Sequence, residues 1–158
     1  MTSTKFREAE PRDLVEHQRQ LREEGFCIIP DVLPSSKAKE ALDRLWRAAK
    51  ESRRRGNDTY LPHLDPNESN VRVFYLMELD EIFRDLISHP TAVSMVQSLL
   101  GEDFLVSNFT ANIARPGSGS MGLHSDLSLQ CPDPWVAPWG LNVIWYTTRP
   151  KTGLSNNG

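Results

Sequence analysis

The sequence contains few cysteines and no long apolar run, and each shortage excludes a class of protein. Cys27 and Cys131 are its two cysteines, too few and too far apart for a disulfide framework or a thiolate zinc site. No segment approaches the roughly eighteen apolar residues of a membrane-spanning helix. The polar N-terminal segment MTSTKFREAEPRD also lacks the apolar region of a signal peptide. We therefore expect a cytoplasmic protein with no membrane partner.

An excess of positive charge is also lacking. The formal net charge is −3 at pH 7, and the one basic cluster, Arg53 to Arg55, runs directly into a Gly-Asn-Asp turn, as a solvated helix end does. We therefore expect no nucleic-acid partner. The chain has 158 residues, of which 39% are hydrophobic and 25% are charged, and this fits one soluble globular domain with a single core.

Two helices are predicted in the first third of the chain. Asp13 and Glu16 form a capping-box pattern at the start of an apolar stripe that ends at Gly25, a typical helix stop. Ser35 or Ser36 caps a second helix, whose small and apolar residues recur at the spacing of an amphipathic helix packed against something larger. This helix ends in the arginine cluster.

Two further helices are predicted over residues 80–88 and 90–100. They are separated at His89 because the residue before a proline disfavours helical backbone. His89 is therefore interpreted as a junction residue. His63 lies in the polar loop 56–70, where a surface position is expected.

Strand signals are concentrated in the second half of the chain. The segments GFCIIP (25–30) and VRVFYLMEL (71–79) read as early strands, and the segments 103–117 and 139–148 as later ones. Helices followed by strands indicate an α+β protein in which N-terminal helices pack on a β-sandwich or jelly roll.

The motif GSGSMGLHSD places His124 and Asp126 one residue apart after a flexible loop. Residues i and i+2 of an extended chain point the same way, so this pair can present an imidazole and a carboxylate to one point in space. With a second histidine, such a pair forms the facial triad that holds one side of Fe(II) and leaves the other side open. On its own, the pattern is equally that of a loop histidine beside a turn aspartate.

Four segments in succession carry a family resemblance: LREEGFCIIPDVLPSSKAKEAL, ISHPTAVSMVQSLLGEDF, IARPGSGSMGLHSD and WGLNVIW. From about Leu14 to Trp145, the sequence resembles the phytanoyl-CoA dioxygenase family of Fe(II)- and 2-oxoglutarate-dependent oxygenases. Within that family, its sequence pattern most resembles that of fungal members that act in secondary metabolism, including those of ergot-alkaloid clusters. The resemblance implies a double-stranded β-helix, a cupin-like jelly roll, with His124 and Asp126 as metal ligands.

The resemblance also implies a cosubstrate and a reaction. Fe(II) and 2-oxoglutarate would support hydroxylation, desaturation or cyclisation of a small natural product, while 2-oxoglutarate is oxidised to succinate and CO₂. Arg72, Met121 and Trp145 fall where relatives surround 2-oxoglutarate, and a cation suits its carboxylate. Their alternative roles are an exposed strand charge, a loop residue and an ordinary core aromatic. Trp135 and Trp139 either wall a substrate pocket or pack a loop.

The resemblance ends after Trp145. Relatives continue with an acidic turn, further strands, a distal histidine ligand and an arginine for 2-oxoglutarate, whereas this sequence reads YTTRPKTGLSNNG. We therefore expect residues 1–145 to be the N-terminal part of a dioxygenase domain with an incomplete jelly roll, and residues 146–158 to be a divergent, out-of-frame tail.

Three readings of the chain remain open at this point. The first is an active oxygenase with a small-molecule substrate, for which a homodimer is allowed. The second is a truncated, catalytically inactive remnant that lacks the distal histidine and the 2-oxoglutarate arginine. The third is a metal-independent binding module in which His124 and Asp126 merely order a loop.

Overall fold

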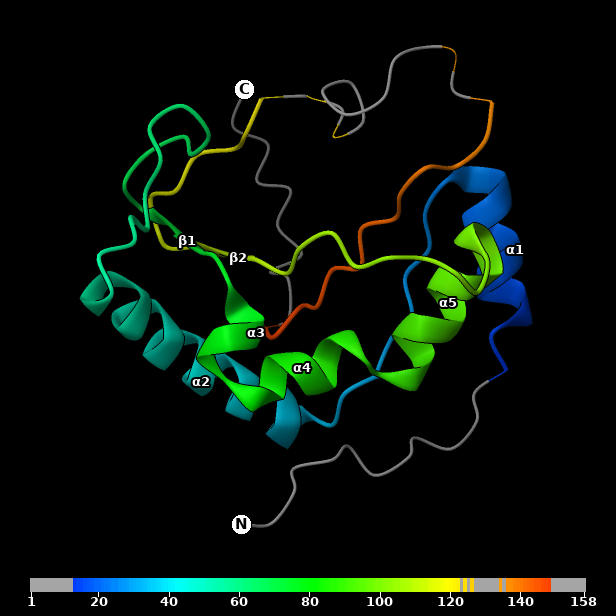
Figure 1. Cartoon of the computed structure of the whole chain (residues 1–158), viewed down its shortest axis with the longest axis horizontal. Coiled ribbons are helices and arrows are strands. Elements are labelled where there is room, and N and C mark those ends of the chain that lie inside the picture. The colour runs from blue at the N-terminus through cyan, green and yellow to red at the C-terminus, as the bar shows by residue number, and fades with distance from the viewer. Residues whose placement is uncertain (1–12, 123, 125, 127–133, 135, 149–158) are drawn as a thin grey trace.

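The computed structural model of the chain describes residues 13–122, 124, 126, 134 and 136–148. Within these residues, a small two-stranded sheet lies over helices, with one pair of helices apart from it (Figure 1). In chain order the elements are α1 (Val15–Glu24), α2 (Ser35–Arg54), β1 (Asn70–Val73), α3 (Leu76–Leu79), α4 (Glu81–Ile87), α5 (Pro90–Leu100) and β2 (Ala111–Ala114).

The strands β1 and β2 pair antiparallel, and β1 contacts α2. Val71 pairs with Ile113, and Val73 pairs with Ala111. Alternate residues of a strand point to opposite faces of a sheet, so these four apolar side chains share one face. All four belong to the main hydrophobic core or pack against it. The sheet therefore has one apolar face, which it turns toward the helices.

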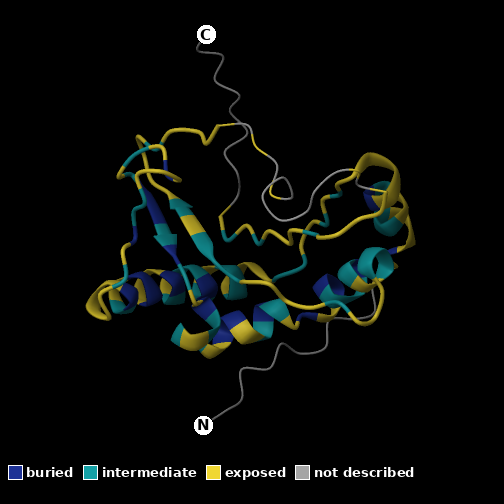
Figure 2. Cartoon of the chain, turned by 45° about the horizontal axis from the view of Figure 1, so that its top comes forward, coloured by how far each residue is buried: buried dark blue, intermediate teal, exposed yellow. Residues whose placement is uncertain are grey.

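The main core lies between α2, the sheet and the α3–α4 segment. Its buried residues are Ala41, Leu45, Ala48, Ala49, Val71, Val73, Leu76, Ile82, Phe83 and Leu86. Figure 2 shows the buried positions of α2 on the side that faces β1, and exposed positions on the other side. The buried face of α2 consists of small residues around Leu45, and through this face the helix packs against β1.

A second, smaller cluster joins α1 to α5. Leu14, Leu21 and Met95 are buried in it, and Leu141 packs against it from much later in the chain. Trp145 packs instead against the main core. In Figure 1 the orange and red segment that carries these two residues runs between the α1–α5 pair and the sheet. The segment 141–145 is thus fixed at both ends by apolar contacts.

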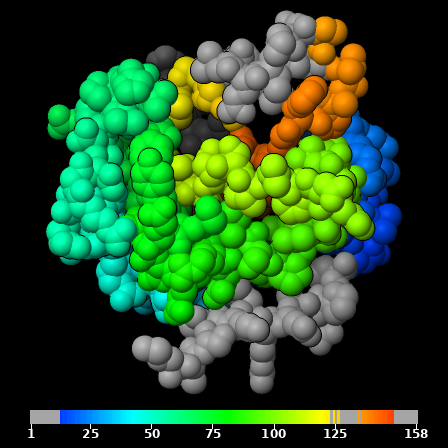
Figure 3. Space-filling view, in the orientation of Figure 1, coloured from blue at the N-terminus to red at the C-terminus, as the bar shows by residue number. Residues whose placement is uncertain are grey.

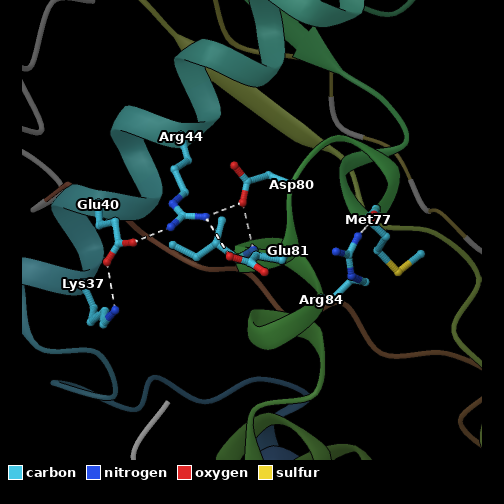
Figure 4. A network of polar contacts seen from close by, with 8 residues as sticks. Lys37, Glu40, Arg44, Met77, Asp80, Glu81 and Arg84 are labelled. Atoms are coloured by element: carbon cyan, nitrogen blue, oxygen red, sulfur yellow. Dashed lines mark hydrogen bonds and ion pairs between the residues drawn. The ribbon is translucent and has the colours of Figure 1, made fainter. Parts of the chain in front are cut away.

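Ion pairs join α2 to the start of α4 (Figure 4). Arg44 of α2 binds Asp80 at 2.7 Å and Glu40 at 2.9 Å, and Lys37 binds the same Glu40 at 2.8 Å. The side chain of Asp80 also accepts a hydrogen bond of 3.0 Å from the Ile82 N–H, so it caps α4. The hydrogen bond from Lys37 lowers the pKa of Glu40 from its ordinary value. The network therefore fixes the position of the first turn of α4 relative to α2.

The four predicted helices are confirmed as α1, α2, α4 and α5. The predicted stop of α1 is also confirmed, since Gly25 closes it in the left-handed conformation at φ 78°. The predicted serine cap of α2 is wrong, because Ser35 is already helical and Pro34 precedes it without a side-chain cap. His89 is a junction as predicted, and its side chain caps α5 by accepting a hydrogen bond from the Thr91 N–H.

The strand predictions are less accurate. The strand predicted over 71–79 ends at Val73, because Tyr75 adopts the left-handed conformation at φ 58° and α3 follows. The segment 25–30 contains no strand, and Ile28 is 76% exposed there. A strand needs a neighbouring strand for its backbone hydrogen bonds, and the described residues provide none beside this segment.

After Gly101 the described chain is mostly irregular, with β2 as its one strand. Figure 3 shows the residues that precede β2 as a yellow-green band across one face of the molecule, and Leu105 in this band is 91% exposed. The mixture of helices and a small sheet agrees with the expected α+β class, while the double-stranded β-helix stays a prediction. None of the described helices combines the length and apolarity needed to cross a membrane.

Candidate metal-binding site

His124 follows the glycine- and serine-rich loop. Its ring Nδ1 lies 2.8 Å from the carbonyl oxygen of Gly122. A carbonyl oxygen only accepts hydrogen bonds, so Nδ1 carries the proton in this contact. In the neutral imidazole the lone pair is then on Nε2, the atom that binds a metal when Nδ1 is held by a backbone carbonyl. The contact with Gly122 thus fixes the orientation of the imidazole ring.

The carboxylate of Asp126 faces Nε2 of His124. The Nε2 atom of His124 and the Oδ1 atom of Asp126 are 3.3 Å apart. Two ligand atoms at right angles around one ion, each ~2.1 Å from it, are separated by about 3 Å. The observed spacing therefore fits two adjacent ligands of one divalent cation. The side chains of His124 and Asp126 are 53% and 60% exposed, so the pair is open to solvent.

The second carboxylate oxygen of Asp126 is also engaged. Its Oδ2 atom accepts a hydrogen bond of 2.6 Å from the side-chain amide of Asn142. Asn142 belongs to the extended segment between Leu141 and Trp145. His124, Asp126 and Asn142 thus form one cluster, built from two segments of the chain.

The loop before His124 is attached to the loop before β1. The backbone N–H of Arg115 donates to the Ser69 carbonyl oxygen at 3.1 Å, and its guanidinium donates to the same oxygen and to that of Glu68. Asn67 donates its side-chain amide to the carbonyl oxygen of Gly117 at 3.0 Å. Gly117 has φ 85°, a conformation that favours glycine, which allows the turn at this point. These contacts hold the glycine-rich loop at the end of the sheet.

Arg72 lies on the sheet face opposite the apolar one, beside its partner Asn112. Its Nε and Nη2 atoms donate to Oδ1 of Asp65 at 3.0 Å and 2.7 Å, and Nη2 is 4.0 Å from the sulfur of Met121. The side chain of Arg72 is only 14% exposed, and that of Asp65 is fully buried. Arg72 is therefore not an exposed strand charge, and the fold brings it to Met121, three residues before His124.

The charge of Asp65 depends on this arrangement. Burial raises the pKa of its carboxyl group, whereas hydrogen bonds from Arg72 and from the Leu61 N–H lower it. The lowering contributions prevail, and the pKa of Asp65 falls below its ordinary value. Asp65 is therefore ionised at neutral pH and holds the guanidinium of Arg72 in one place.

Trp145 contacts the start of α5. Its ring contacts the ring of His89 edge-to-face, with centroids 5.4 Å apart, and it packs against the main core. These contacts fit the alternative of a core aromatic. The described contacts join Arg72 to Met121, and they join His124 to Asp126, but they do not join Trp145 to either pair.

Comparison with known proteins decides the family. Residues 21–147 match the phytanoyl-CoA dioxygenase family, and this range includes His124, Asp126, Asn142, Arg72 and Asp65. The chain belongs to the phytanoyl-CoA dioxygenase family.

One curated protein with a similar sequence is the protein named dioxygenase af480 of Aspergillus fumigatus. It is 54% identical over 132 residues, which are 84% of this chain and 43% of the relative. The chain thus spans less than half the length of that relative. No solved structure matches the sequence.

The remaining histidines of this phytanoyl-CoA dioxygenase family member lie away from the pair. His63 is exposed in its loop, as predicted, His17 is half-buried on α1, and His89 is buried at the start of α5. Among the described residues no three metal-binding side chains gather at one point. Among the described residues, the predicted metal-binding pair of His124 and Asp126 therefore has no third such side chain beside it.

The predicted substrate-wall residues are only partly described. Trp139 is 63% exposed, whereas Trp135 lies outside the described residues. An open hollow of about 330 Å³ lies elsewhere, lined by Arg44, Asp80 and neighbouring charged residues. Because Arg44 pairs there with Asp80 and Glu81, we assign this hollow no ligand.

Asp65 and Asn142 are the site residues that the sequence did not indicate. Asp65 stands in a loop rich in proline and asparagine, where a buried carboxylate is not expected. Asn142 is sixteen positions from Asp126, so no local periodicity relates the two. The signal that could have found Asn142 is its place in the strand-like segment that follows the His-x-Asp motif.

Proposed function

We propose that this chain provides two iron ligands and part of the cosubstrate pocket of an Fe(II)- and 2-oxoglutarate-dependent oxygenase. The observation that carries the proposal is the pairing of His124 Nε2 with Asp126 Oδ1 at 3.3 Å, together with the contact of His124 Nδ1 with the Gly122 carbonyl oxygen, which in a neutral imidazole leaves Nε2 as the metal-binding atom. Membership of the phytanoyl-CoA dioxygenase family and the name of the relative, a dioxygenase, support it. Neutral imidazole and carboxylate are the ligand types of non-haem Fe(II) oxygenases.

The cosubstrate pocket is proposed to form around Arg72 and Met121. A guanidinium attracts the carboxylate of 2-oxoglutarate, and Asp65 keeps that guanidinium from swinging into solvent. Trp145 is proposed to line the same pocket on the basis of the family resemblance, in addition to its packing against the main core. Bound Fe(II) supplies a centre at which O₂ oxidises 2-oxoglutarate to succinate and CO₂, with one oxygen atom entering succinate and the other entering a hydroxylated product.

The proposed substrate is a small, largely apolar natural product of fungal secondary metabolism, such as an alkaloid. The support is the family resemblance and the fungal source of the relative. Hydroxylation, desaturation and cyclisation all suit this chemistry. Residues 1–145 are proposed as the N-terminal part of the catalytic domain, and the exposed Trp139 as part of a substrate wall.

The test is anaerobic binding of Fe(II) and 2-oxoglutarate to the 158-residue chain. Chelation of Fe(II) by 2-oxoglutarate gives a weak visible charge-transfer absorption, which we expect for the unmodified chain. His124→Ala should abolish the absorption, whereas His63→Ala, which removes an exposed histidine elsewhere, should leave it unchanged. No absorption from the unmodified chain would contradict the proposal and favour a catalytically inactive remnant.

A further inference from the structure

The backbone at Asn142 is held in position by neighbouring residues, although the Asn142 side chain is exposed. Its neighbour Leu141 packs on the cluster between α1 and α5, and Trp145 packs on the main core. Two anchors this close in sequence restrict the backbone between them, because moving it would expose apolar surface at one end or the other. The side-chain amide of Asn142 is therefore presented from a supported backbone.

This amide contacts one particular oxygen of Asp126. The Nδ2 atom of Asn142 donates to Oδ2 at 2.6 Å, while Oδ1 is the oxygen that faces Nε2 of His124. Rotation about the last torsion of an aspartate side chain is soft, so an unsupported carboxylate samples many orientations. A donor on Oδ2 selects the orientation in which Oδ1 is turned toward the imidazole.

The chemistry of an asparagine suits this task. Its amide group donates a hydrogen bond without carrying a charge, so the carboxylate of Asp126 keeps its full negative charge for a cation. A lysine in the same place would compete with the cation for that carboxylate, and an aspartate would repel it. A neutral donor therefore orients the carboxylate of Asp126 without weakening its attraction for a cation.

We propose that Asn142 is a positioning residue that orients Asp126 for metal binding. The inference rests on the proposed function, because it presumes that His124 and Asp126 bind a divalent cation. Hydrogen bonds of this kind to metal-binding carboxylates and imidazoles contribute about 10- to 100-fold in metal affinity. Because Asp126 is well exposed, the lower end of that range, about tenfold, is expected for Asn142.

The experiment is titration of the 158-residue chain with Co(II), which is stable in air and reports its ligands through visible absorption. Affinity is measured by calorimetry, and the absorption spectrum of the saturated protein is recorded. Asn142→Leu keeps a branched side chain of similar size but removes the donor, whereas Asn142→Gln retains an amide. The matched control is Asn108→Leu, at another exposed asparagine in extended chain.

The inference predicts about tenfold weaker Co(II) binding and a changed absorption spectrum for Asn142→Leu. Asn142→Gln should recover part of the affinity, and Asn108→Leu should match the unmodified chain. If Asn142→Leu binds Co(II) as Asn108→Leu does, with an unchanged spectrum, the positioning role is wrong and the metal site stands. If His124→Ala binds as well as the unmodified chain, the metal site is wrong and the inference is overturned with it. Circular dichroism of each variant establishes that it is folded.

Discussion

The pair formed by Asp65 and Arg72 offers a quantitative test of how the site is supported. Removing the carboxylate by Asp65→Ala deprives the guanidinium of Arg72 and the N–H of Leu61 of their acceptor. Both members of the pair are shielded from water, with 0% and 14% of their side chains exposed. The change therefore leaves a mostly buried positive charge without its counter-ion.

The magnitude follows from burial. Removing one partner of a buried ion pair costs about 3–5 kcal/mol. Because Arg72 keeps some access to solvent, we expect a loss of about 3 kcal/mol in the free energy of unfolding for Asp65→Ala. The double variant with Arg72→Met should be less destabilised than the sum of its single variants, with a coupling of about 2 kcal/mol.

The assay is urea unfolding followed by tryptophan fluorescence and circular dichroism. A parallel cycle on Glu16 and Arg19, an exposed pair on α1, should show far weaker coupling because solvent screens it. If Asp65→Ala unfolds within about 0.5 kcal/mol of the unmodified chain, a range typical of surface substitutions, the pair is not buried in solution. The proposed support for Arg72 would then be refuted.

Three further predictions concern the same fold. The pKa of Asp65 lies below its ordinary value in the folded state. The stabilisation that this carboxylate provides is therefore present above the ordinary carboxyl range and is lost as the pH falls through the lowered pKa. Acid titration of the free energy of unfolding should show this loss, and the Asp65→Asn variant should not show it. Phe83→Ala should cost about 3 kcal/mol, because the ring is buried in the main core; a cost no greater than that of the exposed Leu105→Ala would contradict the assigned core. Asp80→Ala should cost about 1–2 kcal/mol through loss of the α4 cap and of the bond to Arg44, and unchanged unfolding would show that neither contact contributes.

The helices could be predicted because their signals are local. The proline after His89 and the glycine at position 25 mark helix boundaries by restricting or freeing the backbone at a single residue. The segment 25–30 could not be predicted in this way. Its apolar residues are typical of a strand, but a strand also requires a partner, and partnership is a tertiary property that sequence alone does not contain.

The candidate site also combines residues whose role follows from local sequence with residues whose role depends on tertiary contacts. The convergence of His124 and Asp126 could be expected because they stand two positions apart in the sequence, although Asp126 lies at a bend and not in a strand. The contributions of Asp65 and Asn142 depend on contacts across the fold, 7 and 16 positions away from their partners. No periodic pattern links those positions, and they emerge only when the loops are placed around the sheet.

The measurement that tests the account most directly is anomalous X-ray diffraction at the iron absorption edge, from crystals of the chain grown anaerobically with Fe(II). The account predicts one strong anomalous peak within bonding distance of both Nε2 of His124 and Oδ1 of Asp126. A peak at another place, or none beside these two atoms, would contradict the claim that they form part of an iron site.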